Sequence, residues 1–227
     1  MSANRGRYFS GKPQRKLPER PASGDTFLIV VEGEDTERIY LDAVRDRLKR
    51  KPAMVVVYHG AHTDPEGIVR EAINKKEAQK GKAGKGTTEP YDQVWVVFDR
   101  EKKNDPRLTQ FPKALQLAEA NDIRVAHSIP SFEFWLLLHF RYTTASCHDC
   151  DAVVKMLNRF IRNYSKSDLP MGDLINRIPT AMKHAAQCHN HWASAPGDGY
   201  PSTHVDKLLQ ELNDSAQADL RIFKSRA

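Results

Sequence analysis

The feature that most constrains the fold is a run of five apolar residues, 27–31, that stops at Glu32 and Gly33. A short apolar run between polar residues is typical of a strand buried on both faces, as in a parallel sheet. A helical pattern follows at once, with Asp35 or Thr36 as its expected cap. Glu32 is therefore expected at the carboxyl end of a strand, where open α/β sheets bind their ligands.

A second apolar run, residues 94–98, ends at Asp99, Arg100 and Glu101. In an extended chain, Asp99 and Glu101 point to the same side. If the two strands are parallel neighbours, Glu32 meets both at one edge of the sheet, where three carboxylates repel one another unless a cation neutralises them. Oxygen ligands of this kind suit Mg²⁺ or Mn²⁺. We therefore predict Glu32, Asp99 and Glu101 as metal ligands and catalytic residues; the alternative is a solvated charged turn at residues 99–103.

The composition limits the class of protein. With 227 residues, one domain is the default, and 40% hydrophobic residues are enough for a core. No apolar run reaches the length of a membrane span, and the polar N-terminal stretch does not resemble a secretory signal. Three cysteines, an odd number, favour a reducing compartment over a disulfide framework. We expect a cytoplasmic protein without membrane contact.

The charge favours an acidic partner, since the net charge is +6 and the sequence pI about 9.2. Residues 1–24 carry six basic residues against one acid, Glu19, and we interpret them as a flexible arm that touches phosphates. A solubilising tail is the alternative. Further basic residues beside Asp99 are predicted to hold a nucleic-acid backbone: Arg100, Lys102, Lys103 and Arg107.

The rest of the chain alternates strands and helices. Apolar runs at 53–58 and 123–127 predict two more strands, and helices are expected at 65–80, 111–120 and 132–140. This order predicts an α/β fold with a parallel sheet of about four strands flanked by helices. Residues 81–88 are glycine-rich but follow a helix, so we interpret them as a basic loop rather than a phosphate-binding loop. Helices at 152–160, 174–188 and 205–212 complete a single domain at 25–227, with a core at 25–142 and a helical extension at 143–227.

Two further carboxylates are accessory candidates. Glu133 lies in the first turn of an otherwise apolar helix, where it is either a favourable charge at a helix N-terminus or a fourth site carboxylate. We favour the site, because burial of that helix would leave Glu133 in need of a partner. Glu37 is the second accessory candidate. His139, on the same helix as Glu133, fits a core histidine as well as a functional one.

All three cysteines fall in two paired patterns, C-x-x-C at Cys147 and Cys150 and C-x-x-H at Cys188 and His191. Paired ligands are typical of a tetrahedral structural zinc site. The gap between the pairs is longer than in small zinc modules, so a histidine-rich helix end is the alternative. A zinc ion here would hold the C-terminal helices to the sheet.

Taken together, several stretches of the chain resemble the RloB family. They occur in the order expected for that family and span about residues 27–212. These stretches are 31–40, 96–101, 131–140, 164–166 and 200–203. The resemblance implies a Toprim-like (Rossmann-like) fold and a role in bacterial phage defence or abortive infection. Toprim proteins hold Mg²⁺ at a phosphodiester with a glutamate after the first strand and an Asp-x-Asp after a later one. By resemblance, Glu32 matches the glutamate, a ligand and general acid/base candidate, and Asp99 matches the first aspartate. Glu101 stands where the second aspartate is usual, with the same charge on a longer arm.

The predicted function is a nuclease that depends on Mg²⁺ or Mn²⁺ and hydrolyses RNA, tRNA or DNA. One alternative is a non-catalytic module that senses nucleic acid, a nucleotide or a partner on the same scaffold. Another is a phosphatase or other phosphoryl-transfer enzyme with small substrates. A partner protein from a defence system and an oligomeric state are left open.

Overall fold

The computed structural model describes residues 25–48, 54–100, 109–147, 149–194 and 201–216. The predicted basic arm at 1–24 lies outside these residues, and so do four predicted site or backbone-binding residues: Glu101, Lys102, Lys103 and Arg107.

The centre of the fold is a five-stranded sheet in the order β2-β1-β3-β4-β5. The first four strands run parallel, and β5 pairs antiparallel with the end of β4. The predicted α/β class and parallel sheet are confirmed. The fifth strand was missed because two residues carry no periodic signal. The strands are β1 (Thr26–Val31), β2 (Met54–His59), β3 (Gln93–Asp99), β4 (Arg124–Ile129) and β5 (Ser202–Thr203).

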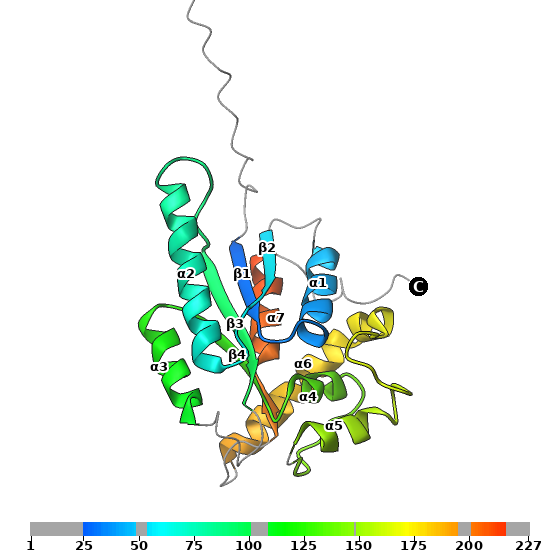
Figure 1. The fold of residues 1–227 in the computed structure, drawn as a ribbon. Helices are drawn as coiled ribbons and strands as arrows, with labels where there is room; N and C mark the ends of the chain where they lie inside the picture. The colour runs from blue at the N-terminus through cyan, green and yellow to red at the C-terminus, as the bar shows by residue number, and fades with distance from the viewer. Residues whose placement is uncertain (1–24, 49–53, 101–108, 148, 195–200, 217–227) are drawn as a thin grey trace, which may run out of the picture.

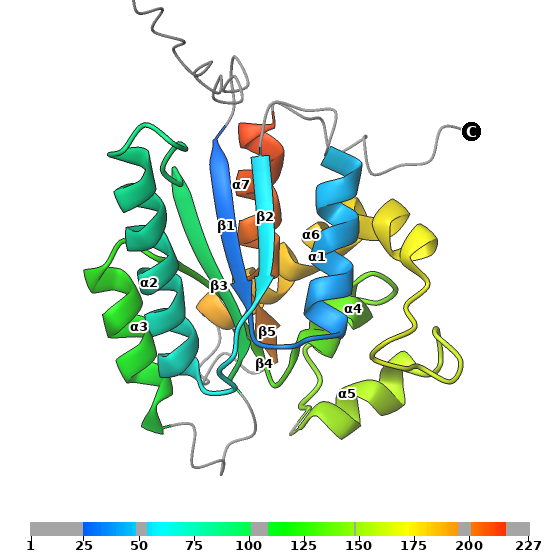
Figure 2. The ribbon, with the colours of Figure 1, turned by 45° about the horizontal axis from the view of Figure 1, so that its top comes forward.

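Helices cover both faces of this sheet, as Figures 1 and 2 show. Helix α2 (Pro65–Ala83) and α3 (Phe111–Ala120) pack on one face, against alternate residues of β1 and β3 such as Leu28 and Val96. The other face carries α1 (Thr36–Leu48), α4 (Phe132–Leu138), α6 (Met171–Ser194) and α7 (Val205–Ser215). Because β1 is buried on both faces, every one of its side chains is apolar or, at Thr26, hydrogen-bonded.

Helix α2 is longer than the sequence predicts. The Asp64 side chain accepts a hydrogen bond from the Gly67 backbone N–H at 2.8 Å, and Pro65 occupies the first turn. The helix then continues to Ala83, so it includes the first residues of the predicted basic loop. Alanine and lysine are good helix formers, which lets the helix run past Gly81.

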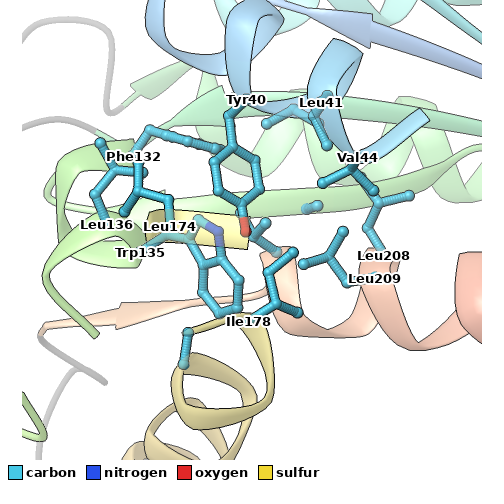
Figure 3. Close-up of a cluster of buried hydrophobic side chains, with 14 of the residues drawn as sticks. Tyr40, Leu41, Val44, Phe132, Trp135, Leu136, Leu174, Ile178, Leu208 and Leu209 are labelled. Carbon is cyan, nitrogen blue, oxygen red and sulfur yellow. The ribbon is translucent and has the colours of Figure 1, made fainter. Parts of the chain in front are cut away.

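The larger core cluster lies between the sheet and the α1/α4/α6/α7 layer (Figure 3). Tyr40 and Trp135 meet at its centre with their rings edge to face, 6.2 Å between centroids. The Tyr40 hydroxyl lies 3.0 Å from Nε2 of His139, whose Nδ1 lies 3.0 Å from the Trp135 carbonyl oxygen. Burial lowers the pKa of His139 to about 4, so the ring is neutral at physiological pH. His139 is therefore a core histidine.

The C-terminal part belongs to the same core. Leu174 and Ile178 of α6 and Leu208 and Leu209 of α7 pack into the cluster that also contains Tyr40 (Figure 3). Helix α5 (Cys150–Leu157) joins it through Val153 and Leu157. Across the described ranges, no helix is both long and apolar enough to cross a membrane.

Candidate active site

Two predicted carboxylates meet where β1 and β3 end. The strands are parallel neighbours in the register Val31 to Val97, so the residues that follow lie side by side. The Glu32 backbone N–H donates to the Val97 carbonyl at 3.0 Å, and the Asp99 backbone N–H donates to Oε2 of Glu32 at 3.1 Å. Both residues are half-buried. We call Glu32 and Asp99 the strand-end pair; it occupies the edge where open α/β sheets bind ligands.

Arg100 follows β3 directly and contacts β4 and α3 rather than β1. Its backbone N–H donates to the Ser128 carbonyl at 2.8 Å, and its guanidinium carbon lies 5.6 Å from the Phe111 ring centroid of α3. The predicted contact of Arg100 with a nucleic-acid backbone stays a prediction, as do those of Lys102 and Lys103.

Glu133, on the first turn of α4, is 2% exposed. The Tyr164 hydroxyl donates to Glu133 Oε1 at 3.0 Å, the Cys150 thiol donates to Oε2 at 3.4 Å, and the Lys166 ammonium lies 3.7 Å from Oε1. Burial disfavours the carboxylate, but the Ser131 hydroxyl, Lys166 and Tyr164 outweigh burial and hold the pKa of Glu133 below its ordinary value. The buried charge therefore has two partners, Tyr164 and Lys166, that the linear sequence places about thirty residues away.

Glu37, on the first turn of α1, is 8% exposed. Burial, together with the negative charge of Glu133, raises its pKa to about 6. The Glu37 carboxylate lies directly against Gly33, where a Cβ atom would overlap it. Glycine leaves room for this close approach, whereas a larger residue would require the Glu37 carboxylate to shift. We call Glu37 and Glu133 the helix-start pair.

Lys166 connects the two pairs electrostatically. Its partial burial disfavours the ammonium, but the negative charges of Glu133, Glu37 and Asp99 outweigh that burial and raise its pKa. The Lys166 carbonyl accepts a hydrogen bond from the Thr36 hydroxyl at 3.3 Å, which ties this segment to the start of α1. Glu133, Glu37 and Asp99 thus all act on the Lys166 ammonium, and Glu32 joins this acidic region through its hydrogen bond with Asp99.

Sequence reasoning gave no role to Tyr164 and Lys166. They occur in a short stretch, 164–166, that contributes to the family resemblance, and nothing in its local pattern says which carboxylate it meets. The sequence predicts Cys150 as a zinc ligand and gives no sign of its contact with Glu133.

The donor set suits a hard divalent cation only in part. In the part of the chain that the structure describes, no three histidine, cysteine, aspartate or glutamate side chains form a group that could hold a metal ion. Two carboxylates are nevertheless a common protein contribution to a Mg²⁺ site, since that ion keeps several waters and binds substrate phosphates. Glu32 and Asp99 are the described residues that fit this role, and Glu101 is the predicted third ligand.

The structure does not bring the cysteines of the predicted zinc site together with His191 as one group of ligands. Cys147 donates to the Ala145 carbonyl at 3.2 Å, Cys188 donates to the Thr143 carbonyl at 3.5 Å, and Cys150 contacts Glu133. Burial and the charge of Glu133 raise the pKa of Cys150 to about 12, so its thiol stays protonated. His191 is exposed at the end of α6. The arrangement of the described residues does not fit four ligands around one zinc ion.

The fold and the site together define an α/β protein with an acidic cluster at the carboxyl edge of a mostly parallel sheet. The family model for RloB-like proteins matches residues 27–212, and the chain therefore belongs to the RloB-like family. No curated protein and no solved structure matches the chain.

Proposed function

We propose that this chain is a Toprim-like, divalent-metal-dependent nuclease that hydrolyses phosphodiester bonds of RNA, tRNA or DNA in bacterial phage defence. One observation carries the proposal: the strand-end pair joins the ends of two adjacent parallel strands, with the Asp99 N–H bonded to Glu32. The matching positions in the Toprim pattern are the glutamate after the first strand and the first aspartate after a later one. Membership of the RloB-like family is consistent with this assignment.

Each candidate site residue has a defined role in the proposed nuclease. Glu32 and Asp99 would hold Mg²⁺ or Mn²⁺, with Glu101 as the third ligand. When bound, the ion would neutralise charge on the phosphoryl oxygens and lower the pKa of a bound water. The helix-start pair is accessory: Glu133 fixes Lys166 and Tyr164 beside the strand ends, where the Lys166 ammonium can contact a phosphate.

The test is cleavage of a mixed panel of tRNA, mRNA and DNA with Mg²⁺ or Mn²⁺, with Asp99→Asn and Glu32→Gln in parallel. The matched control is Asp173→Asn, an aspartate in the first turn of α6 that is half exposed and paired with Arg177. We expect cleavage by the parent chain and the control only. Cleavage of small phosphate esters but of no polynucleotide would indicate a phosphatase.

The second candidate is a non-catalytic sensor of nucleic acid or of a partner. The observation in its favour is that the described side chains do not assemble three metal ligands. A sensor would bind nucleic acid equally well in the parent chain, Asp99→Asn and Glu32→Gln, and none of the three would cleave.

A further inference from the structure

The last turn of α5 and the residues that follow it carry a concentration of positive charge. Residues 155–166 contain four basic side chains and no acidic one. Within the described ranges, the first three of them form no ion pair, and only Lys166 contacts a carboxylate. All four are exposed: Lys155, Arg159, Arg162 and Lys166.

An exposed aromatic ring lies within this segment. Phe160 is 42% exposed, although a ring of this size is usually buried. It stacks on Phe140 with 5.3 Å between centroids and 10° between ring planes, and the Arg177 guanidinium lies 5.1 Å from the Phe140 ring centroid. The stack fixes the orientation of Phe160 while leaving part of the ring open to solvent.

The segment is held in a defined shape beside the candidate site. Asn158 accepts a hydrogen bond from the Tyr164 backbone N–H at 2.9 Å, and Asn163 has φ 54°, a left-handed conformation that asparagine tolerates. These residues, with Arg162, line an open surface hollow of about 540 Å³. The Tyr164 hydroxyl donates to Glu133, so the hollow borders the acidic region. In Figure 2, α5 lies towards the edge of the sheet where β1 and β3 end.

We propose that residues 155–166 form a platform for single-stranded nucleic acid that leads the strand towards the candidate active site. Arginine and lysine side chains would contact successive phosphates, and Phe160 would stack on a base. A single strand fits better than a duplex, because an exposed ring can stack only on a base that has left its own stack. The direction of the strand rests on the proposed nuclease function, whereas the platform itself does not.

The test measures binding without metal, so that it is independent of cleavage. The full chain is titrated with fluorescent single-stranded DNA and RNA of about 16 nucleotides, the upper range of known site sizes, and with the matching duplex. The double variant Arg159→Ala/Arg162→Ala is compared with Lys80→Ala/Lys113→Ala, which removes two exposed charges from α2 and α3 on the opposite face of the sheet. We expect Arg159→Ala/Arg162→Ala to reduce the slope of log affinity against log salt by about 1.4, which is about 0.7 for each phosphate that is no longer neutralised. Lys80→Ala/Lys113→Ala should leave the slope unchanged.

A second comparison isolates stacking. Phe160→Leu keeps an apolar side chain against Phe140 but removes the ring, and Phe160→Trp restores a ring. We expect Phe160→Leu to weaken single-strand binding about fivefold or more and Phe160→Trp to retain it. Tyr142→Leu, at an aromatic residue that is 39% exposed, is the matched control and should bind as the parent does. Weaker binding caused by misfolding would appear in the thermal unfolding of Phe160→Leu and would not be reversed by tryptophan.

The platform is supported if single-stranded DNA or RNA binds with the expected loss of salt dependence in Arg159→Ala/Arg162→Ala and the expected weakening in Phe160→Leu, even if no cleavage is found. An unchanged salt slope in Arg159→Ala/Arg162→Ala would overturn it, as would equal affinity for the duplex with no effect of Phe160→Leu. Failure of the nuclease proposal appears elsewhere, as absent cleavage with intact binding.

Discussion

The strand-end pair and the helix-start pair are both carboxylate pairs, but they differ in environment. Glu32 and Asp99 are half-buried at the open edge of the sheet and are joined through a backbone N–H. Glu37 and Glu133 are buried at the starts of two helices, and Glu133 contacts a hydroxyl, a thiol and an ammonium. A metal ion that keeps several of its waters can reach a carboxylate at an accessible edge more easily than one that is almost fully buried. We therefore propose chemistry for the strand-end pair and positioning for the helix-start pair.

The largest expected effect separates the pairs by activity. Asp99→Asn and Glu32→Gln should lower the cleavage rate on the order of a hundredfold or more while leaving the fold intact, because in the proposed nuclease their carboxylates hold the ion that acts at the phosphoryl group. Glu133→Gln keeps the shape of the side chain and should lower the rate less. Initial rates and thermal unfolding of the three variants provide the test. An equally large decrease in the cleavage rate of Glu133→Gln, at unchanged stability, would show that the two carboxylate pairs do not differ in this way.

The next effect concerns stability. Glu133→Ala leaves the Tyr164 hydroxyl and the Cys150 thiol without their acceptor and should lower the free energy of unfolding by about 2–3 kcal/mol. Asp173→Ala, which removes a half-exposed partner of Arg177, should cost less than about 1 kcal/mol. Urea unfolding measures both. Equal costs would mean that Glu133 is no better integrated than a surface carboxylate.

Much of this arrangement follows from the sequence. The apolar runs before Glu32 and Asp99 predicted two strands with carboxylates at their ends, and the structure pairs those strands directly. Burial of the helix around Glu133 was also predictable, because its residues are almost all apolar. The sequence could not identify the partners of Glu133, since a contact between residues 133 and 164 depends on how the segment after α5 packs against the start of α4 and has no local signal.

A third prediction concerns the pH dependence of stability. The folded protein holds the pKa of Glu37 at about 6, above its ordinary value of 4.5, mainly through burial. The unfolded chain therefore ionises first, and Glu37 lowers the stability of the fold as pH rises from 4.5 to 6, by about 2 kcal/mol or less. The stability of the parent chain minus that of Glu37→Gln should fall across this window and be level above it. The buried histidines are common to both proteins and cancel in the difference, so a flat difference curve would contradict the assignment.

The smallest effect tests the close approach at Gly33. Gly33→Ala places a Cβ atom against the Glu37 carboxylate, which must shift within a buried site, so we expect the protein to be destabilised by about 1 kcal/mol. Gly81→Ala, in α2, meets no atom within 4 Å and should stabilise the protein by up to about 1 kcal/mol. Chemical unfolding of both variants gives the comparison. A stabilising Gly33→Ala would show that Glu37 moves freely.

The most direct test of a metal site at the strand-end pair is Mn²⁺ binding, measured by titration calorimetry on the parent chain, Glu32→Gln, Asp99→Asn and Glu133→Gln. We expect the parent and Glu133→Gln to bind Mn²⁺ with similar affinity and both strand-end variants to bind it at least about tenfold more weakly, a difference of about 1.4 kcal/mol. Unchanged binding in Asp99→Asn, or weaker binding confined to Glu133→Gln, would contradict the assignment of the metal to the strand-end pair.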